Sequence, residues 1–484
     1  MNIGQSSYRK NFIFLLSGQT ASFIINFFAI LLAARFLGVV DFGDFASLLA
    51  VITILSKFID FGMGPVLFRE LSKDPQNENI FSNALSLKLI ISAIVIILMN
   101  SFFLLSSFPA IEIFLANVLF LTIFISSRMA NFREILVTPF KASVNMQLPM
   151  ILNVTDSLLL LIGVLLIPLF KLGVLYFTLI YVLSNLPGFV ILFIQIRKKF
   201  NYHIRLLLKD TKWLIKESAP LAGFVLLMVL YQQVDIILLK YIKGSFDAGI
   251  YAAAARLTLP LNIIPSTFVT VIFPYVVRND KDAENKNLVV VLIFKSLFFI
   301  SIAIALTSSF KINDFTILIF GKGYGAAAIP ALLLFWAQTF LFFNFFSLDL
   351  LTARNVQKWN LVYAALVLVV NLLVDILLIP LYSYNGVGFA KIVAAIFGTI
   401  FLCKILTKIN IAFNFYKLNT FLWLVGVSIL LYVLSIFSLF IYMTVSIIVV
   451  LLLTYYLNFF NNGELILILK FINREKWISK LIKI

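Results

Sequence analysis

The sequence predicts an all-α, polytopic membrane protein with about fourteen transmembrane helices. Of its 484 residues, 62% are hydrophobic and only 12% are charged, which is about half the charged fraction of ordinary soluble domains. Apolar runs long enough for a helix to cross the hydrocarbon core, about 20 residues, recur along the whole chain. The alternating segments of about 10 residues that are typical of transmembrane β-barrels are absent from the sequence.

The individual spans follow from the apolar runs between polar breaks. Residues 12–34 form an apolar run that is too long for a signal peptide, so we expect an uncleaved first helix. Pro260 and Pro265 fall inside the eighth span and should bend it. The fourteen predicted spans lie near residues 12–34, 45–67, 83–105, 112–132, 148–169, 173–195, 217–239, 249–275, 288–309, 325–349, 360–381, 385–407, 418–439 and 441–460.

The placement of Lys and Arg supports this partition and predicts the orientation of the chain. With a cytoplasmic amino terminus, 28 of the 38 basic residues fall on inner segments or within six residues of the inner end of a span, 6 fall on outer connections and 4 lie elsewhere in the spans. We therefore expect both termini in the cytoplasm. The net charge of +17 is then a consequence of topology and does not indicate a nucleic-acid partner.

A short polar motif occurs twice, 206 residues apart, in FLGVVDFGDF (36–45) and IKGSFDAGIY (242–251). Its glycines permit a tight turn, and we expect its aspartate to cap the following helix. The offset joins the first six spans to the next six, which predicts two parallel lobes related by an axis along the membrane normal. The equivalent positions are Gly38, Asp41 and Gly43 in the first copy and Gly244, Asp247 and Gly249 in the second.

The predicted domain organisation follows from this duplication. Two basic stretches with interleaved aromatic residues, 197–218 and 469–484, are expected either to lie in the membrane interface as amphipathic helices or to be solvated loops. The segments are an amino-terminal lobe (1–196), a cytoplasmic linker (197–216), a carboxyl-terminal lobe (217–410), two extra spans (411–462) and a basic cytoplasmic tail (463–484).

Cysteine, histidine and glycine usage narrows the chemistry. Cys403 is the only cysteine and His203 the only histidine, so the chain has no internal disulfide and no cysteine metal cluster. The glycine-rich stretch GKGYGAAAIP (321–330) does not have the spacing of a phosphate-binding loop. We therefore expect no metal, no cofactor and no ATP-driven module in this chain.

Several stretches together match a known family: LAARFLGVVDFGDFASL (32–48), DFGMGPVLFRELS (60–72), YAAAARLTLPLNIIPSTFVTVIFP (251–274), GYGAAAIPALLLF (323–335) and VNLLVDILLIPLYSYNGVGFA (370–390). The chain resembles polysaccharide transporters of the O-antigen flippase type, in the multidrug/oligosaccharidyl-lipid/polysaccharide (MOP) exporter superfamily. The resemblance covers the first twelve spans in order.

The resemblance implies a V-shaped, MATE-like fold of two six-helix lobes with two extra carboxyl-terminal helices. It implies a non-enzymatic transporter that flips polyprenyl-diphosphate-linked oligosaccharides between leaflets by alternating access. The expected location is a bacterial or archaeal cytoplasmic membrane. The expected partners are the lipid-linked oligosaccharide, membrane lipids and the polysaccharide polymerase and chain-length machinery, with no nucleic acid.

Basic residues at membrane depth are the first candidates for a substrate site, because an ionisable side chain inside a span is costly. Lys57 and Asp60 share one helix face, so they either form a structural pair or line a cavity. Arg256 lies roughly 10 Å into the eighth span at 1.5 Å per residue. We expect Lys57 and Arg256 to face a shared cavity and to contact the substrate diphosphate.

Other polar residues in the spans are open to two interpretations. Lys295 and Lys391 either bind substrate or extend to the interface. Gln232 and Gln233 either hydrogen-bond sugar hydroxyls or pack between helices.

The acidic residues in the spans raise a similar question. Asp156, Asp235 and Asp375 either bind a coupling cation or pair with basic side chains. Arg69 and Glu70, at the inner end of the second span, match an Arg-Glu pair of the family, for which a structural or gating ion pair is expected.

Two other functions remain open. A MATE-type multidrug or cation exporter should favour acidic groups in its cavity, whereas Lys57 and Arg256 make the expected wall partly cationic. A membrane polysaccharide polymerase or ligase should expose a sizeable outer loop with acid–base residues, and the outer connections here are short and contain no histidine.

Overall fold

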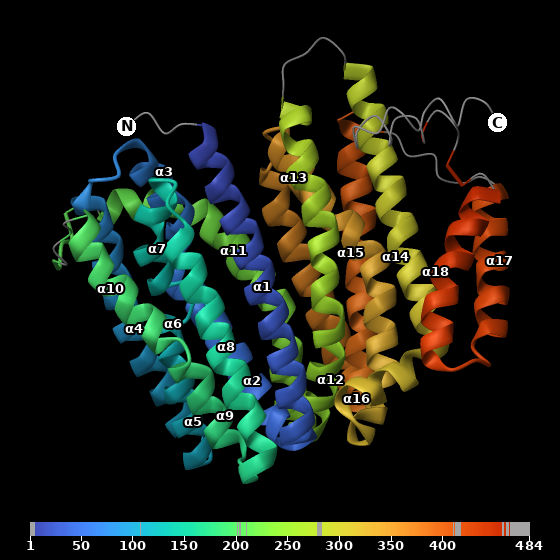
Figure 1. Cartoon of the computed structure of the whole chain (residues 1–484), viewed down its shortest axis with the longest axis horizontal. Coiled ribbons are helices and arrows are strands. Elements are labelled where there is room, and N and C mark those ends of the chain that lie inside the picture. Colours follow the sequence, from blue (N-terminus) through green and yellow to red (C-terminus); the bar gives the residue numbers. More distant parts are fainter. Residues whose placement is uncertain are drawn as a thin grey trace. The chain divides into compact units, whose positions relative to one another are not determined.

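The protein is helical over the residues that the computed structural model describes, which are 5–106, 108–200, 202, 205–209, 211–277, 283–409, 411, 418–456, 459, 460 and 464. Figure 1 follows the helices from the amino terminus in blue to the carboxyl-terminal pair in red. In chain order they are α1 (Gln5–Leu37), α2 (Val39–Asp60), α3 (Met63–Lys73), α4 (Glu78–Leu105), α5 (Ala110–Phe120), α6 (Thr122–Ile125), α7 (Phe132–Ala142), α8 (Gln147–Phe170), α9 (Val174–Leu183), α10 (Leu186–Phe200), α11 (Thr211–Lys243), α12 (Ser245–Thr258), α13 (Ile263–Val277), α14 (Ala283–Phe320), α15 (Ala328–Ala353), α16 (Lys358–Lys408), α17 (Leu418–Leu434) and α18 (Leu439–Tyr456).

Each of the fourteen predicted spans overlaps helix, which confirms the all-α membrane fold. Ten helical segments in the described part are long and apolar enough to cross a membrane, and two shorter apolar ones cover 110–125 and 422–434. The α-helix of the eighth span is interrupted at one of the two predicted prolines, because a short 3₁₀ turn (Leu259–Asn262) that contains Pro260 separates α12 from α13. Two predicted spans share α16, which is interrupted at Ser383, where φ is +50°.

Three local predictions need correction. The second span does not continue to residue 67, because Phe61 and Gly62 adopt left-handed conformations and start the separate helix α3. The fourth span breaks after Ile125 and resumes as α7, a segment predicted to be an inner loop. The stretch 197–218 is not one helix, since α10 ends at Phe200, α11 begins at Thr211 and the described residues between them are not helical. His203 and the stretch 469–484 lie outside the described residues.

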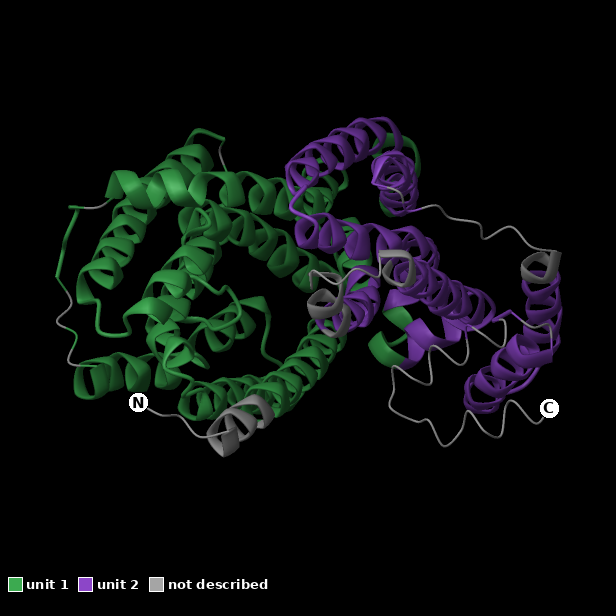
Figure 2. Cartoon of the chain, turned by 90° about the horizontal axis from the view of Figure 1, so that it is seen from above, with its two compact units in different colours: residues 1–253, 319–323, 379–384 green, residues 254–318, 324–378, 385–484 purple. Residues whose placement is uncertain are grey.

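The chain divides into two compact units (Figure 2). Unit 1 comprises residues 1–253, 319–323 and 379–384, and unit 2 comprises 254–318, 324–378 and 385–484. In unit 1, α1 packs along α8, and α11 packs against α2 and α3. The two predicted lobes, with a linker at 197–216, stay a prediction about internal duplication.

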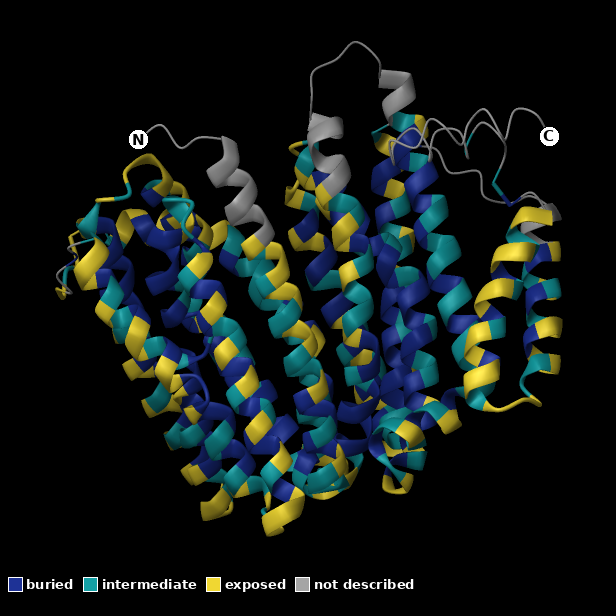
Figure 3. Cartoon of the chain, in the orientation of Figure 1, coloured by how far each residue is buried: buried dark blue, intermediate teal, exposed yellow. Residues whose placement is uncertain are grey.

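Burial within each unit follows the requirements of a membrane protein (Figure 3). Small and apolar residues such as Ala29 and Ala33 of α1 are completely buried, whereas Ile97 and Leu105 of α4 are mostly exposed. Exposure of large apolar side chains on spanning helices is expected where hydrocarbon replaces water. Sequence hydrophobicity therefore identifies the spans and does not identify the core.

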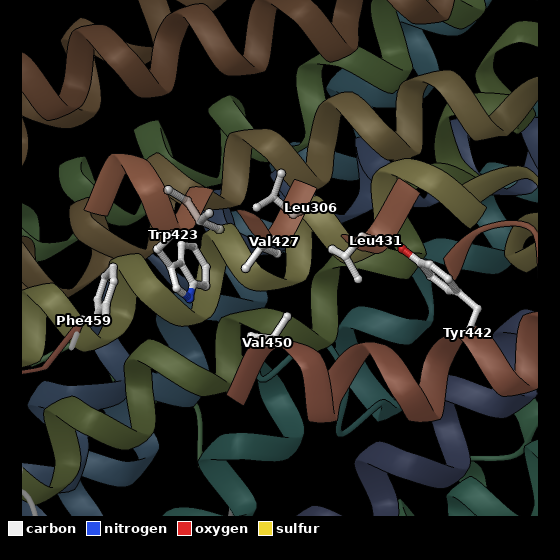
Figure 4. Packing of buried hydrophobic residues seen from close by; sticks show 8 residues of the cluster. Leu306, Trp423, Val427, Leu431, Tyr442, Val450 and Phe459 are labelled. Carbon is white, nitrogen blue, oxygen red and sulfur yellow. The ribbon is translucent and has the colours of Figure 1, made fainter. Parts of the chain in front are cut away.

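The carboxyl-terminal helices α17 and α18 join unit 2 through an aromatic and aliphatic cluster (Figure 4). Trp423 is 1% exposed, and its indole nitrogen donates to the Thr454 hydroxyl at 3.2 Å. The Tyr442 hydroxyl donates to the Thr307 carbonyl of α14 at 2.7 Å. The two extra helices are thus anchored to α14 by packing and by a hydrogen bond.

The duplicated motif forms the turns that precede α2 and α12. Gly38 and Gly244 have φ of +81° and +95°, the left-handed region that glycine adopts without strain. The capping prediction is wrong for α2, since its N-cap is Gly38, with no side-chain cap, and Asp41 lies inside the first turn. There a carboxylate still favours the positive end of the helix dipole.

The third position of the motif serves helix packing in unit 1. A Cβ on Gly43 would collide with the carbonyl oxygen of Ser245, and a Cβ on Gly249 would collide with that of Val39. The equivalent glycines of the two copies therefore allow α2 and the start of α12 to approach backbone to backbone.

Candidate functional site

A broken helix in unit 1 organises a group of buried charges. The stretch SSRMAN (126–131) separates α6 from α7 and is not helical, so some of its backbone groups lack helical partners. Side chains supply partners to two carbonyls of the break: Lys57 Nζ donates to the Met129 carbonyl at 3.1 Å, and Lys88 Nζ donates to the Asn131 carbonyl at 3.4 Å. The Asn131 side chain also joins the break to α2, since its Nδ2 donates to the Ser56 carbonyl at 2.7 Å. Irregular backbone at membrane depth is tolerated where it is buried in protein or lines a cavity.

Of the two interpretations of Lys57 and Asp60, the structure does not show the direct pair, and their place on a substrate cavity stays a prediction. Asp60 is paired with Lys88 of α4, whose Nζ lies 2.6 Å from Asp60 Oδ1. Lys88 is 1% exposed and also donates to the Asn131 carbonyl at 3.4 Å. Lysines from α2 and α4 thus both contact the break, and only Lys88 has a carboxylate at ion-pair distance among the described residues.

Arg133, at the start of α7, forms a buried ion pair with Asp156 of α8. Both side chains are 1% exposed, and Arg133 Nη2 also donates to Asn153 Oδ1 at 3.1 Å. The pair fits only because residue 188 is glycine: a Cβ there would lie 2.6 Å from Arg133 Nη2 and from Asp156 Oδ1. Of the two interpretations of Asp156, the structure shows the pairing, and its coupling-ion role stays a prediction.

Arg128 lies in the break itself and is held by neutral groups. Its Nε donates to Asn26 Oδ1 at 2.9 Å and its Nη1 to the Tyr181 carbonyl at 3.3 Å. The guanidinium carbon lies 4.9 Å from the centre of the Tyr181 ring, in the range of a cation–π interaction. The third nitrogen, Nη2, is buried without a hydrogen-bond partner in the described part of the chain.

A cavity of about 430 Å³ lies beside these residues, entirely within unit 1. Its charged lining residues are Arg128, Arg133, Glu134 and Lys141, and its neutral polar ones are Gln19, Ser22, Asn26, Ser127 and Asn153. Glu134 and Lys141 lie 3.6 Å apart and are partly exposed. Because Arg133 is neutralised by Asp156, the cavity wall carries the uncompensated charge of Arg128.

A second polar cluster joins α11 to α2 and α5. Lys240 is paired with Asp44 and lies 3.2 Å from Glu112 Oε1. Its Nζ also lies 2.7 Å from the Ser245 hydroxyl, which donates to Asp44 Oδ1 at 2.6 Å. These contacts surround the close approach of Gly43 and Gly249.

The remaining predicted basic and amide residues are distributed over several elements. Lys295 of α14 is paired with Glu464 at 2.7 Å and lies over the rings of Phe459 and Phe460. Lys391 is 6% exposed on α16, and Arg256 lies in the last turn of α12. On α11, Gln232 is exposed and Gln233 is half-buried. Their substrate contacts stay predictions.

The other predicted acidic residues have hydrogen-bond partners. Asp235 is completely buried and accepts from the Tyr251 hydroxyl at 2.8 Å. Asp375 is completely buried and accepts from Asn371 Nδ2 at 2.5 Å.

The family Arg-Glu pair is present on α3. Arg69 Nε lies 2.8 Å from Glu70 Oε1, and Arg69 Nη2 lies 3.0 Å from Glu217 of α11. Hydrogen bonds from Lys73 and Arg69 lower the pKa of Glu70, so the pair is charged at neutral pH. It connects α3 to α11 by exposed contacts.

Sequence reasoning missed Lys88 and Arg128, which lie within predicted spans, and Arg133, which lies on a predicted inner segment. The available signal was SSRMANFRE (126–134), where polar residues interrupt an apolar run without proline or glycine. That composition is compatible with both a loop at the membrane surface and a break at membrane depth. Only the fold distinguishes these two possibilities.

Comparison with known proteins places this geometry in a family. A family model described as polysaccharide biosynthesis protein matches residues 8–280, which is more than half of the chain. The chain belongs to the polysaccharide biosynthesis protein family. A search of curated proteins found no match.

Solved structures share the fold of this polysaccharide biosynthesis protein. The lipid II flippase MurJ, in an inward closed conformation, is 17% identical with a TM-score of 0.74, over 92% of this chain and 99% of that one. An inward-facing MATE multidrug resistance transporter of the MOP superfamily is 14% identical with a TM-score of 0.60, and the match covers 80% of this chain and 95% of that one. The MATE multidrug transporter DinF-BH is 17% identical with a TM-score of 0.60, and the match covers 84% of this chain and 96% of that one. These likenesses establish a multi-pass helical fold of the MurJ and MATE type.

Proposed function

We propose that this protein is a flippase of lipid-linked oligosaccharides for surface polysaccharide biosynthesis, such as O-antigen, with polyprenyl diphosphate as the lipid carrier. The observation that carries the proposal is the excess of positive charge around the broken helix of unit 1, on side chains that are buried (Lys88 and Arg133) or half-buried (Lys57 and Arg128). Four cationic side chains, from Lys57, Lys88, Arg128 and Arg133, meet there with two carboxylates, from Asp60 and Asp156.

An excess of buried cations favours an anionic substrate. Burying a charge in a medium of low dielectric is costly unless it is paired and hydrogen-bonded. A diphosphate supplies both the counter-charge and the hydrogen-bond acceptors. Charge-assisted hydrogen bonds from arginine to phosphate are shorter and stronger than neutral ones. In return, fixed cations replace the water that a diphosphate loses when it leaves the membrane surface.

Two further observations support the same function. The family is one of polysaccharide biosynthesis proteins, and one protein of the same fold is a lipid II flippase. A lipid-linked oligosaccharide is a substrate that agrees with the family description. A protein with the same fold is a flippase, so the fold is compatible with lipid flipping. We expect the protein in a cytoplasmic membrane, together with polysaccharide polymerase and chain-length proteins.

Transport in proteoliposomes tests the proposal. The full chain is reconstituted with a fluorescent polyprenyl-diphosphate disaccharide, and the fraction quenched by external dithionite is followed. We expect quenching of the inner-leaflet lipid only in vesicles that contain the protein, and no acceleration for a labelled phosphatidylcholine. Equal acceleration of both lipids contradicts a specific flippase.

The cation exporter is the alternative for which the same vesicles provide a test. A lipophilic cationic dye should not be transported, because the uncompensated charge near the cavity of unit 1 is positive. Dye transport without flipping of the lipid-linked sugar would favour the exporter.

A further inference from the structure

Arg128 is distinguished from the other buried cations around the break by its partners. Lys88 and Arg133 each contact a carboxylate, whereas among the described residues no carboxylate lies within ion-pair distance of Arg128. A guanidinium stays charged in proteins, so burial does not remove its need for a counter-charge. A buried donor that is left without an acceptor, such as Nη2, also destabilises the folded state.

The position of Arg128 is nevertheless well defined. Asn26 and the Tyr181 carbonyl hold Nε and Nη1, and Asn26 is itself fixed by donating to the Ser157 hydroxyl at 2.8 Å. The Tyr181 ring supports the guanidinium plane. The Arg128 side chain is therefore held in one position, and its Nη2 has no hydrogen-bond acceptor among the described residues. Such preorganisation favours binding, because little side-chain freedom is lost when a ligand binds.

The cavity next to Arg128 has room for a ligand group. At about 430 Å³, it lies within the range of small-molecule sites, roughly 300–1,000 Å³. Gln19, Ser22 and Asn153 add neutral hydrogen-bonding groups to the wall. Within the described residues, the other charges that line it belong to Arg133, which Asp156 neutralises, and to the facing pair Glu134 and Lys141.

We infer that this cavity within unit 1 is a binding site for the phosphate groups of a membrane lipid, with the guanidinium of Arg128 as the cation of its wall. The inference rests on the proposed function, and it makes the lipid diphosphate of the transported sugar the ligand. A phospholipid headgroup has the same chemistry, so the experiment separates these two sources. Arg133 is a positioning residue, because its charge is already paired with Asp156 and its Nη2 donates to Asn153.

Binding to the purified full chain in nanodiscs tests the site. The probes are farnesyl diphosphate and inorganic diphosphate in phosphatidylcholine discs, and discs that contain phosphatidylglycerol in place of part of the phosphatidylcholine. We expect Arg128→Gln to weaken farnesyl diphosphate binding about 10- to 100-fold, the effect of one lost charge-assisted hydrogen bond. If phosphatidylglycerol competes fully at equal mole fraction, the site belongs to a membrane phospholipid and the assignment to the transported lipid is wrong.

Asn26→Asp is a second variant that keeps Arg128 in place. It changes one amide into a carboxylate beside Nε, so that Arg128 gains an internal counter-charge with almost no change in volume. We expect a similar loss of affinity with an unchanged elution profile. Arg197→Gln is the matched control, because Arg197 is an exposed arginine of α10 that stacks on Phe193 and lies outside the cavity.

The outcomes separate this inference from the proposed function. If wild-type protein flips the lipid-linked sugar and both variants bind and flip as wild type, the cavity assignment is wrong and the flippase stands. If wild-type protein neither binds farnesyl diphosphate nor flips the sugar lipid, the proposed function fails. An equal loss of binding in Arg197→Gln shows a general charge effect and overturns the role of Arg128.

Discussion

Buried charges in unit 1 are stabilised by partners on neighbouring elements. Lys57 reaches a free carbonyl of the broken helix, Asp60 is neutralised by Lys88, and Arg133 is neutralised by Asp156. A buried pair contributes little net stability, but removal of one partner leaves an uncompensated charge at a high cost. For the pairs Lys88–Asp60 and Arg133–Asp156, the stability of the protein should therefore fall more when one partner loses its charge than when that partner is replaced by a residue of the same charge.

Lys57 provides the first test at this scale. We expect Lys57→Glu to abolish flipping, because a carboxylate would face the Met129 carbonyl and lie near Asp60. Lys57→Arg should retain part of the activity, since a guanidinium also donates to a carbonyl. Lys209→Glu, at an exposed lysine outside the helices, is the control for a change in net charge. Normal flipping by Lys57→Glu at wild-type protein levels would show that the cation is dispensable.

Asp156 provides the second test. Asp156→Asn leaves Arg133 buried without a counter-charge and should destabilise the protein by about 3–5 kcal/mol. Asp314→Asn removes a carboxylate that is 47% exposed and paired with Lys311, and should cost at most about 1 kcal/mol. The measurement is the midpoint of denaturant unfolding of the purified proteins. Equal midpoints for the two variants would contradict a structural role of the Arg133–Asp156 pair.

Two departures from regular helix packing shape unit 1. The break at 126–131 places Arg128 and free backbone groups inside the unit, and discontinuous helices of this kind commonly form the sites of transporters. The close approach of α2 to α12 depends on Gly43 and Gly249, where a side chain would collide with backbone. Small residues generally allow such contacts between helices in membranes.

The glycine contact predicts a strong response to added volume. Gly43→Leu and Gly249→Leu should each destabilise the protein by at least about 1–3 kcal/mol, the cost of overpacking, because the atoms that must move are backbone. Gly323→Leu is the matched control, as no atom lies within 4 Å of a Cβ at that position. Thermal unfolding of the three variants in detergent compares them. An unchanged midpoint for Gly43→Leu would show that α2 and α12 separate readily.

At the scale of the whole molecule, the distribution of charge predicts the topology. The even number of predicted spans, and the 28 basic residues on or near inner segments against 6 on outer connections, predict that both termini lie in the cytoplasm. Each predicted span overlaps described helix, and the number of crossings and their orientation stay predictions.

Reporter fusions test this orientation. Fusions of alkaline phosphatase after residue 5 and after residue 484 should be inactive, while green fluorescent protein at the same two sites should fluoresce. A fusion in an outer connection, after Lys171, should show the opposite pattern. An active phosphatase at residue 484 would mean that the number of spans is odd.

The sequence by itself determined the all-α class, the approximate positions of the apolar spans and the helix interruption at Pro260, because each depends on local composition. It did not reveal the breaks after Asp60 and Ile125. A run of about 20 apolar residues forms a helix in hydrocarbon whatever its neighbours are, and proline acts on its own helix. The sequence also identified Lys57, Asp60 and Asp156 as costly charges, but it did not reveal Lys88 as the partner of Asp60. Only the tertiary structure decided that Lys88 neutralises Asp60, that Arg133 neutralises Asp156 and that Arg128 is left beside a cavity. These outcomes depend on which faces of distant helices meet, and hydrophobic periodicity contains no information about that register.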